Sequence, residues 1–568
     1  MKILKQQTAL ILSQATGLSV LELEQALTNP PKSDMGDISF PCFKIAAGTT
    51  KKPNQVAIEI AEKLVPFLNK YDLLDSVQAV GPYVNFVANK GLLYKNTIKW
   101  VTDSQKNRFK KPTNGKTVVI DYSSPNIAKP IAFHHIRSTV IGNIIGNIFD
   151  SLGYKVVRIN YLGDWGTQFG KLVTAFEKYG DQKKLEDDGV NHLLEIYVRY
   201  HKEQTNELDD EARKWFRLME AGDEKAINYW KKFREISIKE FERVYKRLDV
   251  KFTNIEGESF YNKKSEEIIN KIDKKIGTTQ SDGALIIDLS KYDMPPVLLK
   301  KTDDTTLYAT RDLAAAFDRM DRFNFDESLY VVANQQELHF RQIFKVLDLM
   351  GCEWVNRCKH IQFGLLHLSD GKMSTREGNV VFLEDVLNKS VELARQAIDD
   401  KNPDLDNKEE VAESIGVGAI IFGDVSKRRT QDITFKWEEI LSFDGETAPY
   451  VQYTHARACS ILKKTGFCES KIDNLVDYQP TDIEHDIIKL ILEFESKLHE
   501  SKNDYEPFVL ARYVLDLSRA FNKYYYQEKL IDVQNEDERE CKLALVYSVK
   551  ETIKAVLSIM GIRSPERM

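Results

Sequence analysis

The sequence predicts an α/β protein whose central domain is a doubly wound parallel sheet split by an insertion, between an N-terminal α+β domain and an all-helical C-terminal domain. Three observations predict this architecture. Two strand–helix–strand patterns lie in the middle of the chain, a long helical pattern separates them, and strand patterns disappear after about residue 440. A chain of 568 residues is also too long for one hydrophobic core, so we expect several domains.

The first predicted domain covers residues 1–112. Helical patterns dominate it, and the β-branched and aromatic run 83–87 predicts a strand near its end. The segment SQKNRFKKPTNGK follows, and its Lys, Asn, Pro and Gly residues are typical of a linker. We therefore expect a new domain to begin at about residue 113.

The first strand–helix–strand unit begins with the β-branched run 117–122, which predicts a buried strand. Apolar residues at helical spacing run from about 135 to 152, and Gly153 ends that helix. The next strand is predicted at 155–160. Such a unit implies parallel pairing, because the connection between the strands is a helix.

A second unit consists of a strand at 328–333, a helix at 338–350 and a strand at 360–366. Between the units, about 170–280, Glu, Lys, Trp and Phe recur at helical spacing, which predicts an insertion of amphipathic helices. The predicted domains are thus 1–112, 113–440 and 441–568.

Ligands of doubly wound sheets bind at the carboxyl ends of strands, so the loops after strands are the candidate sites. The first such loop is DYSSPNIAKPIAFHHIRST, in which two prolines favour an extended chain. His135 lies near a helix N-terminus, which favours phosphate, and Lys129 adds positive charge. A His there can donate to a developing oxyanion on phosphorus. Taken alone, a His at a helix start is more often a cap or a core residue.

The second loop is DGKMSTREGN, 370–379, which follows the last predicted strand. Its two glycines, two cations and two hydroxyls are typical of a loop that closes over phosphates. Lys372 supplies charge and Ser374 a hydroxyl. Many surface turns share this composition, so the loop alone is weak evidence.

The third candidate combines TLYATRDLA with ANQQELHF. Tyr308 and Asp312 stand four residues apart and share one face if the segment is helical. With Gln335 and Gln336 nearby they form a possible cradle for a cation, and a guanidinium matches carboxylates best. A surface ion pair between Asp312 and Arg311 remains the alternative. Together the three loops predict an ATP-using enzyme that acts on a positively charged small molecule.

RNA contacts are expected from local patches, because the net charge of −6 argues against coating nucleic acid by bulk charge. The clearest patch places Arg512 and other basic residues around Tyr524, Tyr525 and Tyr526. Unstacked bases stack on aromatic side chains, while Lys and Arg side chains pair with phosphates. A solvated helix face is the alternative reading of this patch.

Metal and membrane sites are not predicted. The six cysteines include no CxxC pair and no zinc spacing, so we expect reduced thiols in a cytoplasmic protein without a protein-bound metal. No apolar run approaches the roughly 20 residues that span a bilayer.

The chain resembles bacterial arginyl-tRNA synthetases along nearly its whole length. The resemblance rests on SSPNIAKP, IRSTVIGN, RINYLGDWGTQFGKL, YVVANQQELHF, DGKMSTREGN, GETAPYVQYTHARA and MGIRSPERM. It implies a class I synthetase catalytic domain of Rossmann type, an N-terminal domain that contacts the outer corner of tRNA(Arg) and a helical anticodon-binding domain. It further implies Mg-ATP and arginine as substrates, a first step that requires bound tRNA, and a monomer.

The resemblance also implies site residues. The arginine pocket would comprise Asp121, Tyr308 and Asp312 at the guanidinium, with Asn126 and Gln336 at the α-amino end. The residues expected to be catalytic or to bind ATP are Lys129, His134, His135, Lys372, Met373 and Ser374. Those expected to bind tRNA are Arg512, Tyr524, Tyr525 and Tyr526.

Both signatures of the class depart from the family pattern. Where the family has His-x-Gly-His, this chain has Ala132-Phe133-His134-His135. The first His of the motif is therefore absent, and His134 replaces the Gly. We hypothesise that His134 supplies the missing imidazole from a neighbouring position. Family Lys-Met-Ser-Lys lacks its second lysine here, for which Lys129 is expected to compensate.

Two rival functions remain as alternatives. One is a synthetase-like RNA-binding or regulatory protein that has lost its chemistry, which only the altered first signature supports. The other is a class I synthetase for a different amino acid, which the acidic pocket and the segment DWGTQFGKL disfavour.

Overall fold

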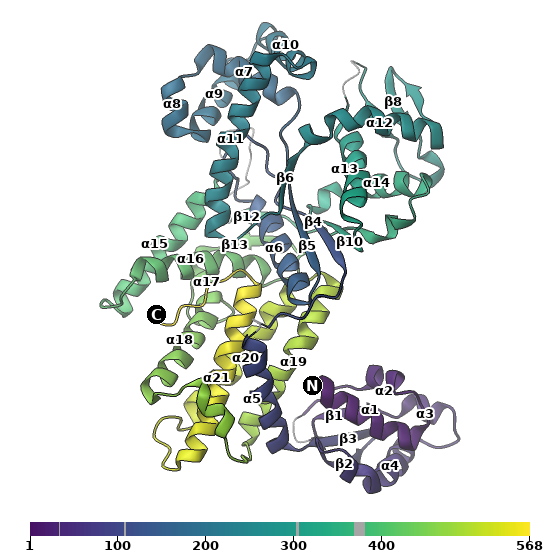
Figure 1. Cartoon of the computed structure of the whole chain (residues 1–568), viewed down its shortest axis with the longest axis vertical. Coiled ribbons are helices and arrows are strands. Elements are labelled where there is room, and N and C mark those ends of the chain that lie inside the picture. The colour runs from purple at the N-terminus through teal and green to yellow at the C-terminus, as the bar shows by residue number, and fades with distance from the viewer. Residues whose placement is uncertain (33–34, 107–108, 303–305, 369–380) are drawn as a thin grey trace.

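The computed structural model describes residues 1–568 except 33–34, 107–108, 303–305 and 369–380. The central sheet lies in the middle of the molecule, with two lobes of inserted elements on one side of it (Figure 1). The helical C-terminal domain extends from the opposite side, and the N-terminal domain lies beside the far end of those helices. The three predicted parts are therefore arranged along the molecule in space.

The N-terminal domain is an antiparallel sheet covered by helices. Its strand order is β1-β3-β2, and the predicted strand at 83–87 is confirmed as β3. Gly81 turns the hairpin between β2 and β3 with a positive φ of 56°. The elements are α1 (Lys2–Thr16), α2 (Val20–Ala26), β1 (Ile38–Pro41), α3 (Phe43–Ala47), α4 (Pro53–Leu64), β2 (Leu74–Val80) and β3 (Tyr83–Ala88). The next helix, α5 (Lys90–Lys106), packs on the C-terminal helices, where the Tyr94 hydroxyl donates to the Cys541 carbonyl at 2.8 Å.

The central sheet has five parallel strands in the order β11-β10-β4-β5-β6. The strands are β4 (Thr117–Asp121), β5 (Lys155–Leu162), β6 (Asn254–Gly257), β10 (Glu327–Tyr330) and β11 (Cys358–His360). Strand order reverses between β4 and β10, so a crevice is expected where these two strands end. The helix predicted after the first strand is confirmed as α6 (His135–Ser151), and Gly153 ends it with a φ of 82°. The helix predicted at 338–350 is α14 (Glu337–Leu349).

The strand predicted at 360–366 is not continuous. β11 ends at His360, and β12 (Leu366–Leu368) pairs instead with β13 (Ile433–Phe435) in a separate parallel pair. Between them the Gly364 carbonyl accepts from Arg137 at 2.7 Å, and its N–H donates to the Arg429 carbonyl at 2.9 Å. These bonds replace the sheet ladder, so an apolar run that reads as one strand is divided between two sheets.

The insertion has two parts rather than one. The first is helical and comprises α7 (Thr167–Tyr179), α8 (Gln182–Asp188), α9 (Val190–Lys202), α10 (Asn206–Ala221) and α11 (Glu224–Arg247). The chain then returns to the sheet as β6, within the range predicted as helical. The second part comprises α12 (Glu258–Ile276), β7 (Thr279–Ser281), β8 (Ala284–Ile287), β9 (Val297–Lys300) and α13 (Tyr308–Phe323). The four residues of β6, NIEG, carry no apolar run, so the sequence pattern does not reveal this strand.

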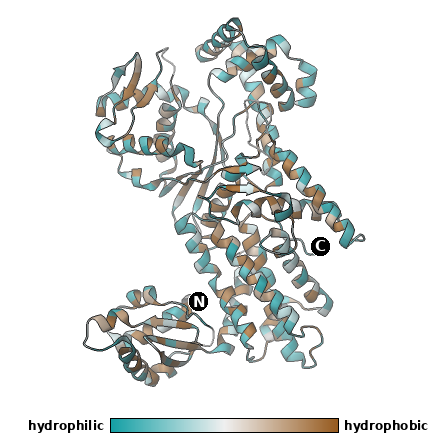
Figure 2. Cartoon of the chain, turned by 180° about the vertical axis from the view of Figure 1, so that it is seen from behind, coloured by the Kyte–Doolittle hydropathy of each residue, from teal (hydrophilic) through white to brown (hydrophobic). Residues whose placement is uncertain are grey.

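After residue 440 the described chain is helical, as predicted. Its long helices are α18 (Ala448–Thr465), α19 (Asp482–Asp504), α20 (Phe508–Gln527) and α21 (Glu536–Ile559), and α15 (Leu383–Lys401) and α16 (Lys408–Val425) join them to the sheet. Figure 2 shows hydrophobic and hydrophilic residues alternating along these helices, as in packed bundles. None of the helices in the described part of the chain is both long and apolar enough to cross a membrane.

The turn between α19 and α20 joins the helical domain to the sheet. The Tyr505 hydroxyl donates to Glu327 at the start of β10 at 2.5 Å, and Tyr505 adopts a positive φ of 51°. Its carbonyl accepts from Arg429 Nε at 3.1 Å, while the Glu506 carboxylate accepts from the Arg429 N–H at 3.0 Å. Arg429 is therefore part of the junction between the helical domain and the sheet.

Candidate active site

The loop after β4 is held rigidly at the carboxyl edge of the sheet. Ser138 on α6 accepts from the Ser123 N–H at 2.9 Å and donates to the Val331 carbonyl at 2.7 Å, so it joins the loop to the end of β10. Asn126 bridges to Gly163 after β5. A Cβ at Gly163 would lie 1.9 Å from Asn126 Oδ1, which explains the need for glycine in LGDWG.

His134 and His135 lie together at the start of α6, with ring centroids 4.2 Å apart. The pKa of His135 is lowered to about 3, chiefly by burial and also by the neighbouring His134. Burial also lowers the pKa of His134. His135 Nδ1 lies 3.2 Å from the Ala132 carbonyl, which can only accept, so Nδ1 carries the proton and Nε2 is an acceptor. Near neutral pH this pair offers uncharged imidazoles at the helix N-terminus.

The altered first signature is joined to the segment after the second one. Ala132 pairs with Phe382 in an isolated antiparallel bridge, and the Phe133 N–H donates to the Val381 carbonyl at 2.8 Å. The two segments are therefore hydrogen-bonded to one another. The predicted residues Lys372, Met373 and Ser374 lie outside the described part of the chain.

Lys129 lies between the first loop and the helical insertion. Its ammonium is 4.6 Å from the centroid of the Tyr197 ring on α9, a cation–π contact. Burial lowers the pKa of Lys129. The structure thus places this lysine in the loop that carries the first signature, with its head group against the insertion.

The structure brings the predicted arginine-pocket residues to the same edge of the sheet. Asp312 on α13 and His339 on α14 are 2.7 Å apart, and the Tyr308 ring packs 4.9 Å from that of His339. Tyr308 is 53% exposed and Gln336 is exposed, so both are accessible to a ligand. The second oxygen of Asp312 is available to a cation.

Two residues that the sequence did not reveal complete this pocket. The pKa of Glu258 is raised to about 7, chiefly by burial and also by the charge of Asp312, against the opposing effect of Arg311, which lies 3.1 Å from Glu258. The buried Tyr161 hydroxyl has no partner among the described residues, and Asp312 and Glu258 raise its pKa beyond what burial does. Glu258 directly follows β6, so the strand-end rule would have identified it had β6 been recognised.

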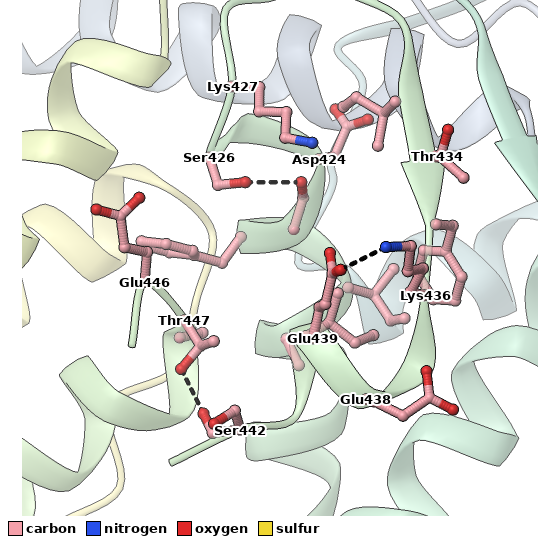
Figure 3. A pocket seen from close by; sticks show the side chains of 18 of the residues that line it. Asp424, Ser426, Lys427, Thr434, Lys436, Glu438, Glu439, Ser442, Glu446 and Thr447 are labelled. Carbon is pink, nitrogen blue, oxygen red and sulfur yellow. Dashed lines mark hydrogen bonds and ion pairs between the residues drawn. The ribbon is translucent and has the colours of Figure 1, made fainter. Parts of the chain in front are cut away.

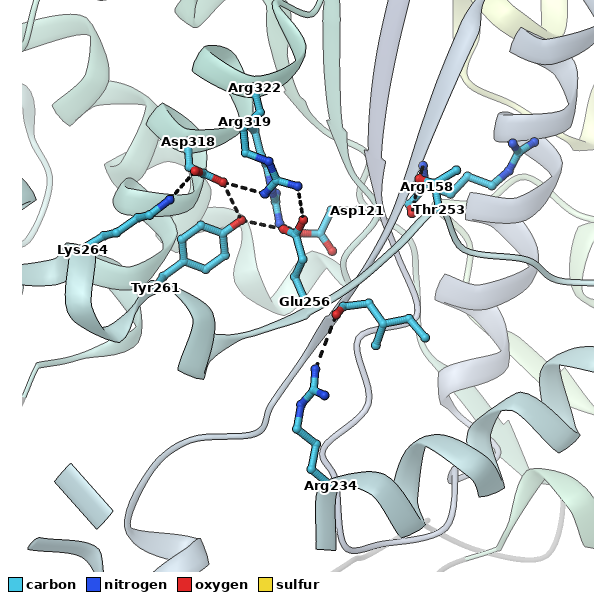
Figure 4. Close-up of polar contacts among 11 residues, drawn as sticks. Asp121, Arg158, Arg234, Thr253, Glu256, Tyr261, Lys264, Asp318, Arg319 and Arg322 are labelled. Carbon is cyan, nitrogen blue, oxygen red and sulfur yellow. Dashed lines mark hydrogen bonds and ion pairs between the residues drawn. The ribbon is translucent and has the colours of Figure 1, made fainter. Parts of the chain in front are cut away.

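Asp121, at the end of β4, is paired within the protein. Its Oδ2 accepts from Arg319 Nη2 at 2.7 Å and its Oδ1 accepts from the Ser124 hydroxyl at 3.1 Å. Behind this pair lies a polar network in which Tyr261 and Arg322 bind both Glu256 and Asp318 (Figure 4). The network ties β6, α12 and α13 together, so the acidic pocket has a stiff base.

Asp164 of the LGDWG segment organises the start of α12. Its carboxylate accepts from the Ser259 N–H at 2.9 Å and from Arg234 Nε of the insertion at 2.9 Å. Because Ser259 is adjacent to Glu258, Asp164 orients the helix end that carries the pocket carboxylate. A Cβ at Gly257 would lie 2.2 Å from Asp164, which requires glycine there as well.

The predicted RNA-binding residues are separated by the fold. Tyr524 is buried and donates to Glu484 at 2.7 Å, and Arg512 pairs with Glu446. Tyr526 is 74% exposed, and Tyr525 is half-buried. Sequence reasoning missed Arg457, whose guanidinium lies over the rings of Tyr453, Tyr525 and Tyr526 at 4.9, 4.8 and 5.4 Å.

A cavity of about 570 Å³ lies beside this aromatic cluster, between α15, α18 and α20. Arg457, Tyr453 and Tyr526 line it, together with Met568 and Phe443. An arginine stacked among exposed tyrosines is suited to an unstacked nucleic-acid base. Among the described residues, no group of three or more His, Cys, Asp or Glu side chains is arranged to hold a metal ion.

Comparison with known proteins assigns the chain to a family. Residues 99–437 match the family "tRNA synthetases class I (R), catalytic domain", residues 451–568 the "DALR anticodon binding domain" and residues 2–88 the "Arginyl tRNA synthetase N terminal domain". An arginine–tRNA ligase of Clostridioides difficile is 46% identical over 97% of both chains, and one of Halothermothrix orenii is 44% identical over 98% of both.

Solved structures agree with the fold. The arginyl-tRNA synthetase of Thermus thermophilus superposes with a TM-score of 0.82 at 24% identity, covering 100% of each chain. That of Plasmodium falciparum gives 0.79 at 22% identity, covering 100% of this chain and 99% of its own. The family matches and the full-length relatives together show that this chain belongs to the arginyl-tRNA synthetases of class I.

Proposed function

We propose that the protein activates arginine with ATP and transfers it to the 3′ end of tRNA(Arg). An arginine carboxylate oxygen attacks the α-phosphorus of ATP, the bond to the β-phosphate breaks, and arginyl-adenylate and diphosphate form. The terminal ribose hydroxyl of the tRNA then attacks the arginyl carbonyl and AMP leaves. The acidic pocket of Asp312 and Glu258, at the carboxyl edge of the sheet, is the observation that carries this proposal.

Arginine selection is assigned to that pocket. Asp312 and Glu258 offer carboxylate oxygens to a forked guanidinium, and the unpartnered Tyr161 hydroxyl adds a further contact. Asp121 contributes negative charge to the pocket floor, where it is already bonded to Arg319. Lysine presents a point charge and cannot engage two carboxylates in one plane, so it should be rejected.

The arginine backbone and the ATP are assigned to the strand-end loops. Tyr308, Asn126 and Gln336 are exposed, and the two amides are suited to the α-amino end of arginine. The phosphates would meet the N-terminus of α6 and the positive charge of Lys129. His134 and His135 would act as neutral groups, and His135 Nε2 would accept from a ribose or water hydroxyl. From the second loop, Lys372, Met373 and Ser374 are assigned by family pattern.

Recognition of tRNA is assigned to the cavity beside Arg457. A base entering it would stack among Tyr453 and Tyr526, next to the Arg457 guanidinium. Arg512 and Tyr525 remain candidates for phosphate and sugar contacts, whereas buried Tyr524 would support the cluster from below.

Several further assignments follow from the family. Residues 1–112, 113–440 and 441–568 would act as the tRNA-corner, catalytic and anticodon-binding domains. Mg²⁺ would arrive with ATP and not on a protein site. The protein would work as a cytoplasmic monomer.

The proposal is tested by ATP–diphosphate exchange and by aminoacylation, each with arginine, lysine and citrulline, with and without tRNA(Arg) transcript. Of the three amino acids, only arginine should support both reactions. Citrulline has the shape of arginine without its charge, so its rejection tests the carboxylates. Asp312→Asn should raise KM for arginine by about 10- to 150-fold, the loss of one hydrogen bond to a charged group. Binding of tRNA without any charging would favour an RNA-binding protein that has lost its chemistry.

A further inference from the structure

A second cavity, of about 490 Å³, lies at the junction between the sheet region and the helical domain, behind the first signature (Figure 3). We call it the junction cavity. Its walls come from α16, β13, the short helix α17 (Trp437–Ile440) and the start of α18. Its volume is in the range of small-molecule sites. The residues of the amino-acid pocket do not line it.

The junction cavity has an apolar floor. Phe133, Ile136, Ile420, Ile433 and Phe435 are buried side chains that line it. Phe133 and Phe435 meet edge to face, with centroids 5.0 Å apart. A floor of this kind accepts an aromatic or branched alkyl group by the hydrophobic effect.

The polar part of the cavity is acidic. Five of its lining residues are carboxylates and two are lysines: Asp424, Glu438, Glu439, Asp444 and Glu446 against Lys427 and Lys436. Lys436 is paired with Glu439 at 2.7 Å, as the dashed contact in Figure 3 shows. Asp424 and Glu446 pair with arginines outside the lining, Arg137 and Arg512. Among the described residues this leaves Glu438 and Asp444 against Lys427, a small excess of negative charge that favours a cationic guest over nucleotides and other phosphates.

One of these carboxylates is bonded on one side only. Asp424 Oδ1 accepts from Arg137 Nε at 2.9 Å, whereas Oδ2 has no hydrogen-bond partner among the described residues. The Asp424 side chain is only 3% exposed. A buried carboxylate oxygen without a donor is unfavourable, and a ligand N–H would remove that cost.

The floor of the junction cavity is also part of the catalytic apparatus. Phe133 stands between Ala132 and His134 in the first signature, and Ile136 follows His135. Phe435 belongs to β13, whose partner β12 leads directly into residues 369–380. A guest on this floor would therefore touch Phe133 of the first signature and Phe435 of β13, the strand paired with β12.

We propose that the junction cavity binds an organic cation, a primary amine on an apolar body, and that its occupancy modulates the ligase reaction. The ammonium group donates to Asp424 Oδ2, and the apolar body packs against Phe133 and Phe435. The site is distinct from the arginine pocket, which opens at the carboxyl ends of the central strands.

The test uses the full-length protein with 2-phenylethylamine as probe and 2-phenylethanol as its uncharged match. Saturating arginine is present throughout, so that the acidic amino-acid pocket is filled. Calorimetry should give a Kd for the amine at least about tenfold below that for the alcohol, since a charge-assisted hydrogen bond distinguishes them. Equal affinities, or no binding of the amine, would overturn the proposal.

Substitutions in the junction cavity test whether the amine binds there. Ile420→Trp places a large side chain on the floor of the cavity. Thr434→Trp blocks the cavity from an exposed position in its wall, where a large side chain is tolerated. If one variant fails to fold, the other is used. Both should abolish binding of amine and alcohol. Asp424→Asn keeps an oxygen for Arg137 and should remove the preference for the amine. Unchanged amine binding in the blocked variant places the site elsewhere and refutes the assignment.

A functional readout accompanies binding. The rate of aminoacylation, measured at saturating arginine, ATP and tRNA, should change with amine concentration at the same midpoint as binding. The Thr434→Trp variant should charge tRNA without responding to the amine. A rate that is flat while the amine binds would refute the modulatory part of the proposal.

Discussion

The Asp121 carboxylate and the Arg319 guanidinium lie 2.7 Å apart beneath the arginine pocket, with Arg319 only 1% exposed. Arg319 also lies 5.4 Å from the ring centroids of both Tyr161 and Tyr330. A guanidinium of the chain itself thus occupies a carboxylate that the family pattern assigns to the substrate. Glu258 is likewise paired with Arg311 at 3.1 Å, so Asp312, which pairs with His339 and with no guanidinium among the described residues, is the pocket carboxylate best placed to bind a substrate guanidinium.

Arg319→Met should destabilise the protein by about 3–5 kcal/mol, because it leaves Asp121 buried without its counter-charge. The midpoint of thermal unfolding measures this loss. Adding Asp121→Asn should restore part of it, since the double variant has no unpaired charge. If the loss of stability in the double variant equals the sum of the losses in the two single variants, the pairing of Asp121 with Arg319 is contradicted.

Glu258 should make arginine binding depend on pH near neutrality. Its pKa is raised to about 7, so it loses its charge as the pH falls through 7 and then no longer attracts the substrate cation. KM for arginine should rise by up to about tenfold between pH 8 and pH 6. Glu258→Gln should have a high KM and a flat profile over that range. A wild-type profile in the variant would assign the titration to another group.

Lys129→Ala should lower kcat by about 10²- to 10³-fold, the loss expected when one charge-stabilising donor is removed from a phosphoryl-transfer site. Steady-state exchange kinetics separate kcat from KM, and an effect on KM alone would contradict the assignment. Tyr197→Leu, which removes only the ring under the ammonium, is the matched control and should cost far less.

His134→Ala tests whether this imidazole replaces the one missing from the first signature. We expect slower exchange at saturating substrates, because His134 lies beside His135 at the N-terminus of α6, where it can reach a bound phosphate. His134→Gly, which restores the family residue, serves as the comparison. An unaffected rate would end the hypothesis.

Arg457→Ala should raise KM for tRNA by about tenfold or more while leaving arginine-dependent parameters unchanged, because base–aromatic stacking contributes about 1–3 kcal/mol. Tyr524→Phe is the matched control in the same helical cluster. It removes a hydroxyl buried against Glu484, so it should affect thermal stability more than KM for tRNA.

The sequence alone identified the family, the three-part organisation and most of the strand-end loops. These features depend on local patterns. The buried run before Asp121 and the helical spacing after His135 both reflect neighbouring residues, and SSPNIAKP and LGDWGTQFGKL are contiguous. Lys129, Asp312 and the histidines could be proposed as site residues because they lie inside or beside such segments.

Only the tertiary structure decided which charges meet. Arg319 is 198 residues from Asp121, and Glu258 approaches Asp312 because β6 and α13 converge on one edge of the sheet. The burial of Tyr524 and the exposure of Tyr526 follow from how α20 packs, although both belong to one tyrosine run. Pairing and burial depend on segments distant in sequence, so residue type and spacing along the chain do not specify them.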